Sequence, residues 1–133
     1  MSNKSNGAAF EKEFAETLSA SGFWVHLLRD NQNGQPFDII AAKNGTTFVF
    51  DCKDCTSYQF DLTRVEENQK TAMALWTECG NREPLFVLRF ADLGIWVMTY
   101  TDAMSAITNG TKAVTRKNLF ELATPFCFWR DEG

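Results

Sequence analysis

The segment FDIIAAKNGTTFVFDCK, residues 37–53, carries the clearest structural signal in this chain. It contains two runs rich in β-branched and aromatic residues, 37–43 and 46–53, with Asn44-Gly45 between them. An Asn-Gly pair flanked by such runs favours a two-residue type I′ turn, because both of its residues tolerate positive φ. The sequence therefore predicts a β-hairpin that turns at Asn44 and Gly45.

A two-residue turn at this place also fixes the register of the hairpin, and Asp38 then lies directly opposite Asp51. Opposed side chains share a face with their β-carbons roughly 4.5–5.5 Å apart, and like charges there destabilise a sheet. A divalent cation would relieve the repulsion, since clusters of carboxylate oxygens are natural ligands for Mg²⁺ or Mn²⁺. Lys53 points to the same face by strand alternation and could orient or deprotonate a water molecule beside the metal.

The rest of the chain predicts helices and strands in alternation. Phe10, Phe14 and Leu18 recur every four residues among charged side chains, the pattern of an amphipathic helix, and Thr63 and Glu66 have capping-box spacing. The expected elements are a helix at 8–19, a strand at 23–28, the two hairpin strands, a helix at 64–79, strands at 84–90 and 95–100, and a short helix from 101 to about 108. Residues after 111 show no clear pattern. This order predicts an α/β layer architecture.

The composition is typical of a single domain spanning residues 1–133. Hydrophobic residues make up 44% of the chain and charged residues 23%, both within the ordinary range. No apolar run approaches the roughly 20 residues of a membrane span, and the polar N-terminus has no apolar segment behind it that could serve as a secretory signal. We therefore expect a cytoplasmic protein without membrane contact.

The net charge of −4 argues mildly against a nucleic-acid partner, because nucleic-acid-binding domains are usually basic. A catalytic centre built from several carboxylates would lower the total charge without forbidding a local basic surface. The charge therefore weakens a DNA-binding interpretation and does not exclude it.

The four cysteines are too few and too unevenly spaced for a secreted disulfide framework, so reduced thiols are expected. Cys52 and Cys55 have the C-x-x-C spacing of zinc sites and redox dithiols. However, strand alternation turns Cys52 away from Asp51 and Lys53, into the layer behind the sheet, where a thiol behaves as a small hydrophobe. The one histidine, His26, makes the ligand supply for structural zinc poor. We expect both cysteines to be structural.

The hairpin also carries a familiar motif. Pro36-Phe37-Asp38, followed after the turn by Asp51-Cys52-Lys53, resembles the PD-(D/E)xK nuclease motif. The similarity extends over roughly residues 7–100 to the Holliday-junction resolvases of the archaeal Hjc and bacterial RecU families. The further matching positions are Phe10-Glu11-Lys12-Glu13, Asp38-Ile39-Ile40, Phe60, Leu62, Glu66 and Gln69.

This resemblance implies a restriction-endonuclease-like core, a central mixed β-sheet flanked by helices. It also implies an active site in which Glu11, Asp38 and Asp51, together with the carbonyl of Cys52, hold one or two Mg²⁺ (or Mn²⁺) ions. Lys53 would position the attacking water molecule.

Three further residues are weaker candidates. Gln69 follows Glu66 by one helical turn, and its family position implies a contact to the attacking water or to a phosphate, although an ordinary exposed glutamine is an equal alternative. Arg29 and Arg64, at the ends of elements, are candidates for phosphate contacts in DNA binding or are surface arginines without a role.

The implied function is that of a Mg²⁺-dependent endodeoxyribonuclease acting on branched DNA, a four-way junction, as a homodimer that makes paired nicks. Two alternatives stay open: a nuclease of the same fold that acts on other DNA in restriction, repair or phage genome processing, and a non-catalytic DNA-binding protein of this fold. The aromatic residues Trp96, Phe126, Phe128 and Trp129 could form a dimer interface or belong to the core.

Overall fold

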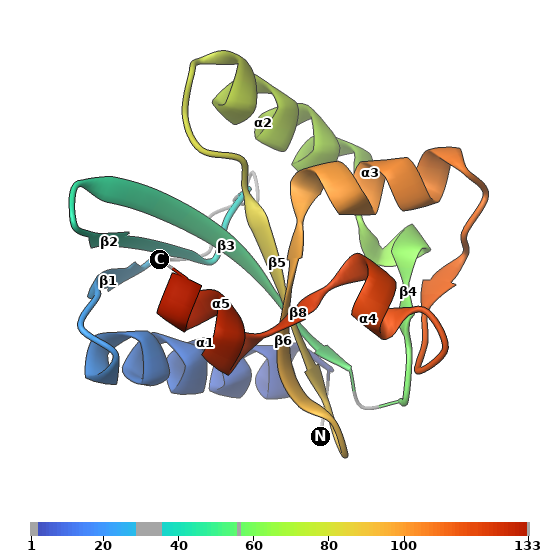
Figure 1. Ribbon diagram of the computed structural model, residues 1–133, viewed down its shortest axis with the longest axis horizontal. Helices are drawn as coiled ribbons and strands as arrows, with labels where there is room; N and C mark the ends of the chain where they lie inside the picture. Colours follow the sequence, from blue (N-terminus) through green and yellow to red (C-terminus); the bar gives the residue numbers. More distant parts are fainter. Residues whose placement is uncertain (1–2, 29–35, 56, 133) are drawn as a thin grey trace.

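A mixed β-sheet lies at the centre of the computed structural model, which describes residues 3–28, 36–55 and 57–132 (Figure 1). Within these residues the sheet has six strands, in the spatial order β1 (Trp24–Leu27), β2 (Ile39–Lys43), β3 (Thr46–Cys55), β5 (Leu85–Phe90), β6 (Gly94–Thr99) and β8 (Thr124–Pro125). The β3–β5 pair is parallel and the other neighbouring pairs are antiparallel. Two short strands, β4 (Phe60–Asp61) and β7 (Ala113–Val114), pair with each other outside this sheet.

Helices cover both faces of the sheet (Figure 1). They are α1 (Asn3–Ala20), the 3₁₀ helix η1 (Leu62–Arg64), α2 (Glu67–Glu78), α3 (Tyr100–Thr108), α4 (Leu119–Leu122) and α5 (Phe126–Glu132). Along β5 the side chains alternate between two buried clusters: Phe86 and Leu88 lie with Met73 of α2, and Val87 lies with Phe14 of α1. The sheet therefore separates a layer containing α2, α3 and α4 from a layer containing α1 and α5, and the predicted mixed sheet flanked by helices is confirmed.

The predicted hairpin is confirmed together with its register. Asn44 and Gly45 have φ values of 53° and 81°, as a type I′ turn requires, and Lys43 pairs with Thr46 next to the turn. At the far end of the ladder Ile39 pairs with Phe50, so that the next residues outward are Asp38 and Asp51.

The predicted start of the second helix is wrong. Thr63 does not cap it, because η1 forms a separate turn that is held by a hydrogen bond from the Leu62 N–H to the Lys112 carbonyl (2.9 Å). The helix begins at Glu67, and Glu66 is its N-cap. The Gln69 Oε1 accepts a hydrogen bond from the Glu66 backbone N–H (3.3 Å), so the capping interaction lies three residues later than predicted.

No helix in the described part of the chain combines the length and the apolar character that crossing a bilayer requires.

Candidate active site

Asp38 and Asp51 meet at the end of the hairpin opposite its turn. The Asp38 backbone N–H donates to the Phe50 carbonyl (2.8 Å), which continues the ladder by one step beyond β2. The Asp38 Oδ2 accepts a hydrogen bond from the Cys52 backbone N–H at 2.7 Å. Folding of the hairpin alone therefore places the Asp38 carboxylate against β3, beside Asp51.

Asp51 is the only polar or charged side chain among the described residues that is buried, with 3% of its surface exposed. Its Oδ1 accepts a hydrogen bond from the Gln69 Nε2 (2.9 Å). Its Oδ2 lies 3.2 Å from the Lys53 Nζ, an ion pair, but this buried oxygen has no hydrogen-bond partner of suitable geometry. One oxygen of the carboxylate is thus held by the protein, and the other is available to a ligand.

The surroundings of Asp51 disfavour its charged form. The pKa of the carboxyl is raised to about 7, chiefly by burial; Lys53 lowers it in part, and the charge of Asp38 adds to the rise. Binding of a proton or a cation neutralises the buried charge and therefore stabilises this site.

Cys52 and Cys55 lie on opposite faces of β3. Cys52 is buried in the cluster with Phe14 of α1, whereas Cys55 is buried in the cluster with Met73 of α2. Both thiols are free, and burial raises the pKa of each, that of Cys55 to about 11. This placement supports the prediction that both cysteines are structural, since thiols on opposite faces cannot act as a dithiol pair.

Glu11 lies on α1, which packs through Phe10 and Phe14 on the face of the sheet that Cys52 occupies. Its negative charge contributes to the raised pKa of Cys52, which places it near the main chain that follows Asp51. Within the described residues no group of three or more His, Cys, Asp or Glu side chains is arranged to hold a metal ion. The structure therefore brings Asp38 and Asp51 together but does not group Glu11 with them.

The other predicted residues fall in different places. Gln69, from the first turn of α2, reaches Asp51 directly, so its side chain joins the start of that helix to the site. The guanidinium of Arg64, at the end of η1, lies 5.4 Å from the centre of the Phe60 ring. Arg29 lies outside the described residues.

One contact near the site was not predicted from the sequence. The Arg89 guanidinium donates to both oxygens of Asp54 (3.2 and 2.8 Å) and also pairs with Glu13 of α1. Asp54 follows the motif on β3, but its partner lies 35 residues away on the neighbouring strand. Nothing local in the sequence indicates that partner.

The donor set fits a hard divalent cation. Two carboxylates converge, and one buried oxygen, the Asp51 Oδ2, lacks a hydrogen-bond partner. Oxygen ligands of this kind are the preferred ligands of Mg²⁺ and Mn²⁺. Lys53 beside the same oxygen supplies a positive charge and a proton donor.

Comparison with known proteins identifies the family of this chain. A structure of Archaeoglobus fulgidus Hjc, described as a Holliday junction resolvase from an archaeal hyperthermophile, superimposes with a TM-score of 0.59 at 15% sequence identity, over 72% of this chain and 78% of that one. No curated protein matches the sequence. The model of the archaeal Holliday junction resolvase (Hjc) family matches residues 2–126. The chain therefore belongs to the archaeal Hjc family and is a junction-resolving nuclease.

Proposed function

We propose that this protein is a Mg²⁺-dependent (or Mn²⁺-dependent) crossover junction endodeoxyribonuclease that resolves four-way DNA junctions by paired nicks. The observation that carries the proposal is the Asp51 carboxylate, buried beside Asp38 and Lys53 with one oxygen lacking a hydrogen-bond partner. An unused buried acceptor of this kind is uncommon in proteins and points to a ligand.

Asp38, Asp51 and the Cys52 carbonyl would hold the cation, with Glu11 as a further acidic ligand. The role of Glu11 rests on the family resemblance and on its electrostatic proximity to Cys52. When bound, the metal would act as a Lewis acid on the scissile phosphate and lower the pKa of a bound water.

The protein's own groups prepare this site. The Gln69 amide orients the Asp51 carboxylate by donating to Oδ1, and Oδ2, which has no hydrogen-bond partner, would be the oxygen that binds the cation. The Lys53 ammonium, 3.2 Å from that oxygen, would hold the attacking water by a hydrogen bond and balance the negative charge of the phosphate. The Cys52 N–H orients Asp38 through its 2.7 Å hydrogen bond.

The domain boundaries and the cellular location of the protein are also part of this proposal. The family match spans residues 2–126, and we assign a single nuclease domain to residues 1–133. A nuclease whose substrate is a recombination intermediate works where the DNA is, so we place it in the cytoplasm.

The test is cleavage of labelled four-way junction, flap and linear duplex DNA, with Mg²⁺ and with a chelator. Asp38→Asn and Asp51→Asn should each lower the rate of junction cleavage by about 100-fold or more, because each removes a charged ligand of the cation. Both variants should still bind junction DNA, since binding depends mainly on phosphate contacts elsewhere.

Asp61→Asn is the matched control, because Asp61 is an exposed carboxylate that lies outside the site. It should cleave at the wild-type rate. Full activity of Asp51→Asn, or activity of the wild-type protein in excess chelator, would contradict the assigned site. Equal cleavage of linear duplex would contradict junction resolution and leave a general nuclease.

A further inference from the structure

A cavity of about 290 Å³ opens beside the turn of the β2–β3 hairpin, at the far end of these strands from Asp38 and Asp51. Three aromatic rings and three basic side chains line it: Phe23, Phe48 and Trp129, with Lys43, Arg82 and Arg130. Its other lining residues are Asn44 and Thr46, so the described residues place no carboxylate in its wall. None of these residues belongs to the proposed active site.

Buried aromatic rings support two of the three basic side chains, Lys43 and Arg82. The Lys43 Nζ donates to the Ser21 carbonyl (3.0 Å) and lies 4.9 Å from the centre of the Phe23 ring. The Arg82 guanidinium lies 5.0 Å from the centre of the Phe48 ring. Phe23 and Phe48 are 7% and 5% exposed, so both cations rest on rigid parts of the core. Such support pre-organises a site for an anion.

The charges of this pocket are largely uncompensated. Arg130 pairs with the neighbouring Asp131 (3.1 Å), but in the described part of the chain neither Lys43 nor Arg82 forms an ion pair with a carboxylate. Three cations converge here although the net charge of the chain is −4. Like charges gathered in this way destabilise a fold, and an anion that binds between them removes the repulsion.

The rings of the pocket are not available for stacking on a base. Trp129 already stacks on Phe23 (6.0 Å between ring centres) and meets Phe48 edge to face (5.3 Å). The available binding groups are therefore the cations. Guanidinium and ammonium groups together recognise phosphate oxygens through charge-assisted hydrogen bonds.

We propose that this pocket binds a backbone phosphate of the DNA, a second contact remote from the scissile phosphate. The inference rests on the proposed junction substrate. Lys43, the last residue of β2, lies five positions from Asp38, about 17 Å at roughly 3.4 Å per residue, and this odd spacing puts the two side chains on opposite faces of the sheet. A phosphate bound in the pocket is therefore not the scissile phosphate. The pocket would set how an arm lies relative to the active site.

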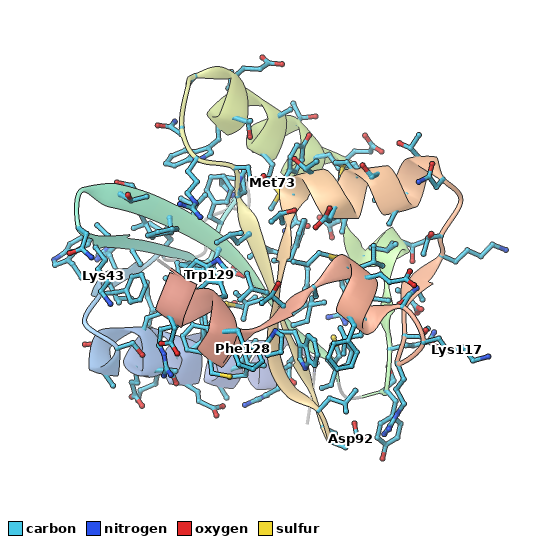
Figure 2. All side chains as sticks on the ribbon, in the orientation of Figure 1. Lys43, Met73, Asp92, Lys117, Phe128 and Trp129 are labelled. Carbon is cyan, nitrogen blue, oxygen red and sulfur yellow. The ribbon has the colours of Figure 1, made fainter. Side chains whose placement is uncertain are left out.

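The test compares two double variants that lose the same charge. The double variant Lys43→Gln with Arg82→Gln removes two of the three pocket cations. The control, Lys112→Gln with Lys117→Gln, removes two exposed lysines elsewhere. Figure 2 shows Lys117 on the side of the molecule away from Lys43. Junction affinity is measured in chelator at several salt concentrations. The pocket variant should bind about tenfold more weakly than the control, and its slope of log K against log salt should be smaller by about one.

Equal affinity and salt slope for the two double variants would overturn the proposal, whereas loss of cleavage in Asp51→Asn tests the active site separately. A second measurement does not depend on the nuclease function: the indole N–H resonance of Trp129 is followed while inorganic phosphate or a DNA trinucleotide is added. Shifts with both probes in the wild-type protein, absent from the pocket variant, support the proposal. Shifts with inorganic phosphate alone would identify a small-anion site and overturn the assignment to DNA.

Discussion

Asp51 is a carboxylate that folding removes from water, and this gives the stability of the protein a defined pH dependence when no metal is bound. Its pKa rises from 3.8 to about 7 on folding, chiefly through burial, so the folded state binds this proton more tightly than the unfolded chain. The stabilising effect of protonation is complete below about pH 4 and is lost as the pH rises through 7.

The comparison that isolates this effect is with Asp51→Asn, which cannot ionise. In chelator, the wild-type protein should lose about 1.4 kcal/mol of unfolding free energy relative to the variant for each pH unit between roughly 4 and 7. Urea unfolding at several pH values measures the difference. A constant difference across this range would show that Asp51 keeps its ordinary pKa in the fold.

Added Mg²⁺ provides the control for this measurement. A cation bound beside the ionised Asp51 stabilises the folded wild-type protein by an amount that grows with the logarithm of the cation concentration above the dissociation constant, and the Asn variant should gain much less. The same residue would then account for destabilisation without metal and stabilisation with it.

At the scale of elements, Arg89 joins three parts of the fold. From β5 it pairs with Asp54 of β3 and with Glu13 of α1, and its guanidinium lies 4.5 Å from the centre of the Phe10 ring. The side chain of Asp54 is only 14% exposed, so loss of Arg89 leaves it nearly buried and unpaired. Arg89→Gln should lower the unfolding free energy by about 1–3 kcal/mol.

Chemical denaturation measures this change, and Arg116→Gln serves as the matched control. Arg116 also pairs with an aspartate, Asp92, but its side chain is 58% exposed, and surface ion pairs contribute at most about 1 kcal/mol. Equal effects of the two substitutions would show that Arg89 is an ordinary surface contact.

The sequence could predict the contacts that depend on local signals, but not those that depend on tertiary packing. The hairpin, its register and the Asp38–Asp51 juxtaposition follow from a two-residue turn, which is a local signal. The Asp54–Arg89 pair depends on the parallel register of β3 and β5, which is set by the packing of both faces. Gln69 is a candidate site residue only through the family resemblance, because its contact to Asp51 depends on how α2 packs against the sheet.

The C-terminal part was not predictable for a related reason. Strands β7 and β8 contain two residues each, and α4 contains four, too few to show a period in the sequence. The start of α2 was missed because Thr63 and Glu66 have the spacing of a capping box, while tertiary hydrogen bonding draws residues 62–64 into a separate turn.

Junction resolution requires two cuts, whereas one chain contributes one proposed active site, built on Asp38 and Asp51. The two strands to be cut in a four-way junction are related by near two-fold symmetry. A C₂ homodimer supplies two sites in that relation, and such dimers are the commonest oligomers. We therefore expect the active form to be a homodimer.

The structure narrows the surface that could form this dimer. Of the four aromatic residues proposed from the sequence, Trp96 and Phe126 are buried within the chain, and Trp129 packs on Phe23 and Phe48. Phe128 is 61% exposed on α5 and projects from it (Figure 2), and Phe120 on α4, not proposed from the sequence, is 80% exposed. Exposed aromatic residues of this size are typical of interfaces, so these two are candidates for subunit contact, as are Trp24 and Tyr58, which are 62% and 60% exposed.

Light scattering should give about twice the chain mass of 15.1 kDa, and Phe120→Asp with Phe128→Asp should shift the protein to monomer by burying charge at the interface. The mechanistic readout uses mixed dimers of wild-type and Asp51→Asn subunits. Each such dimer has one intact site and should nick one strand of the junction without completing the second cut. A wild-type protein that stays monomeric at micromolar concentration with junction DNA bound, yet still makes paired nicks, would show that one subunit visits both strands in turn. That outcome would reject the dimer while keeping the active site, because the pairing of cuts would then come from repositioning of the DNA rather than from symmetry of the enzyme.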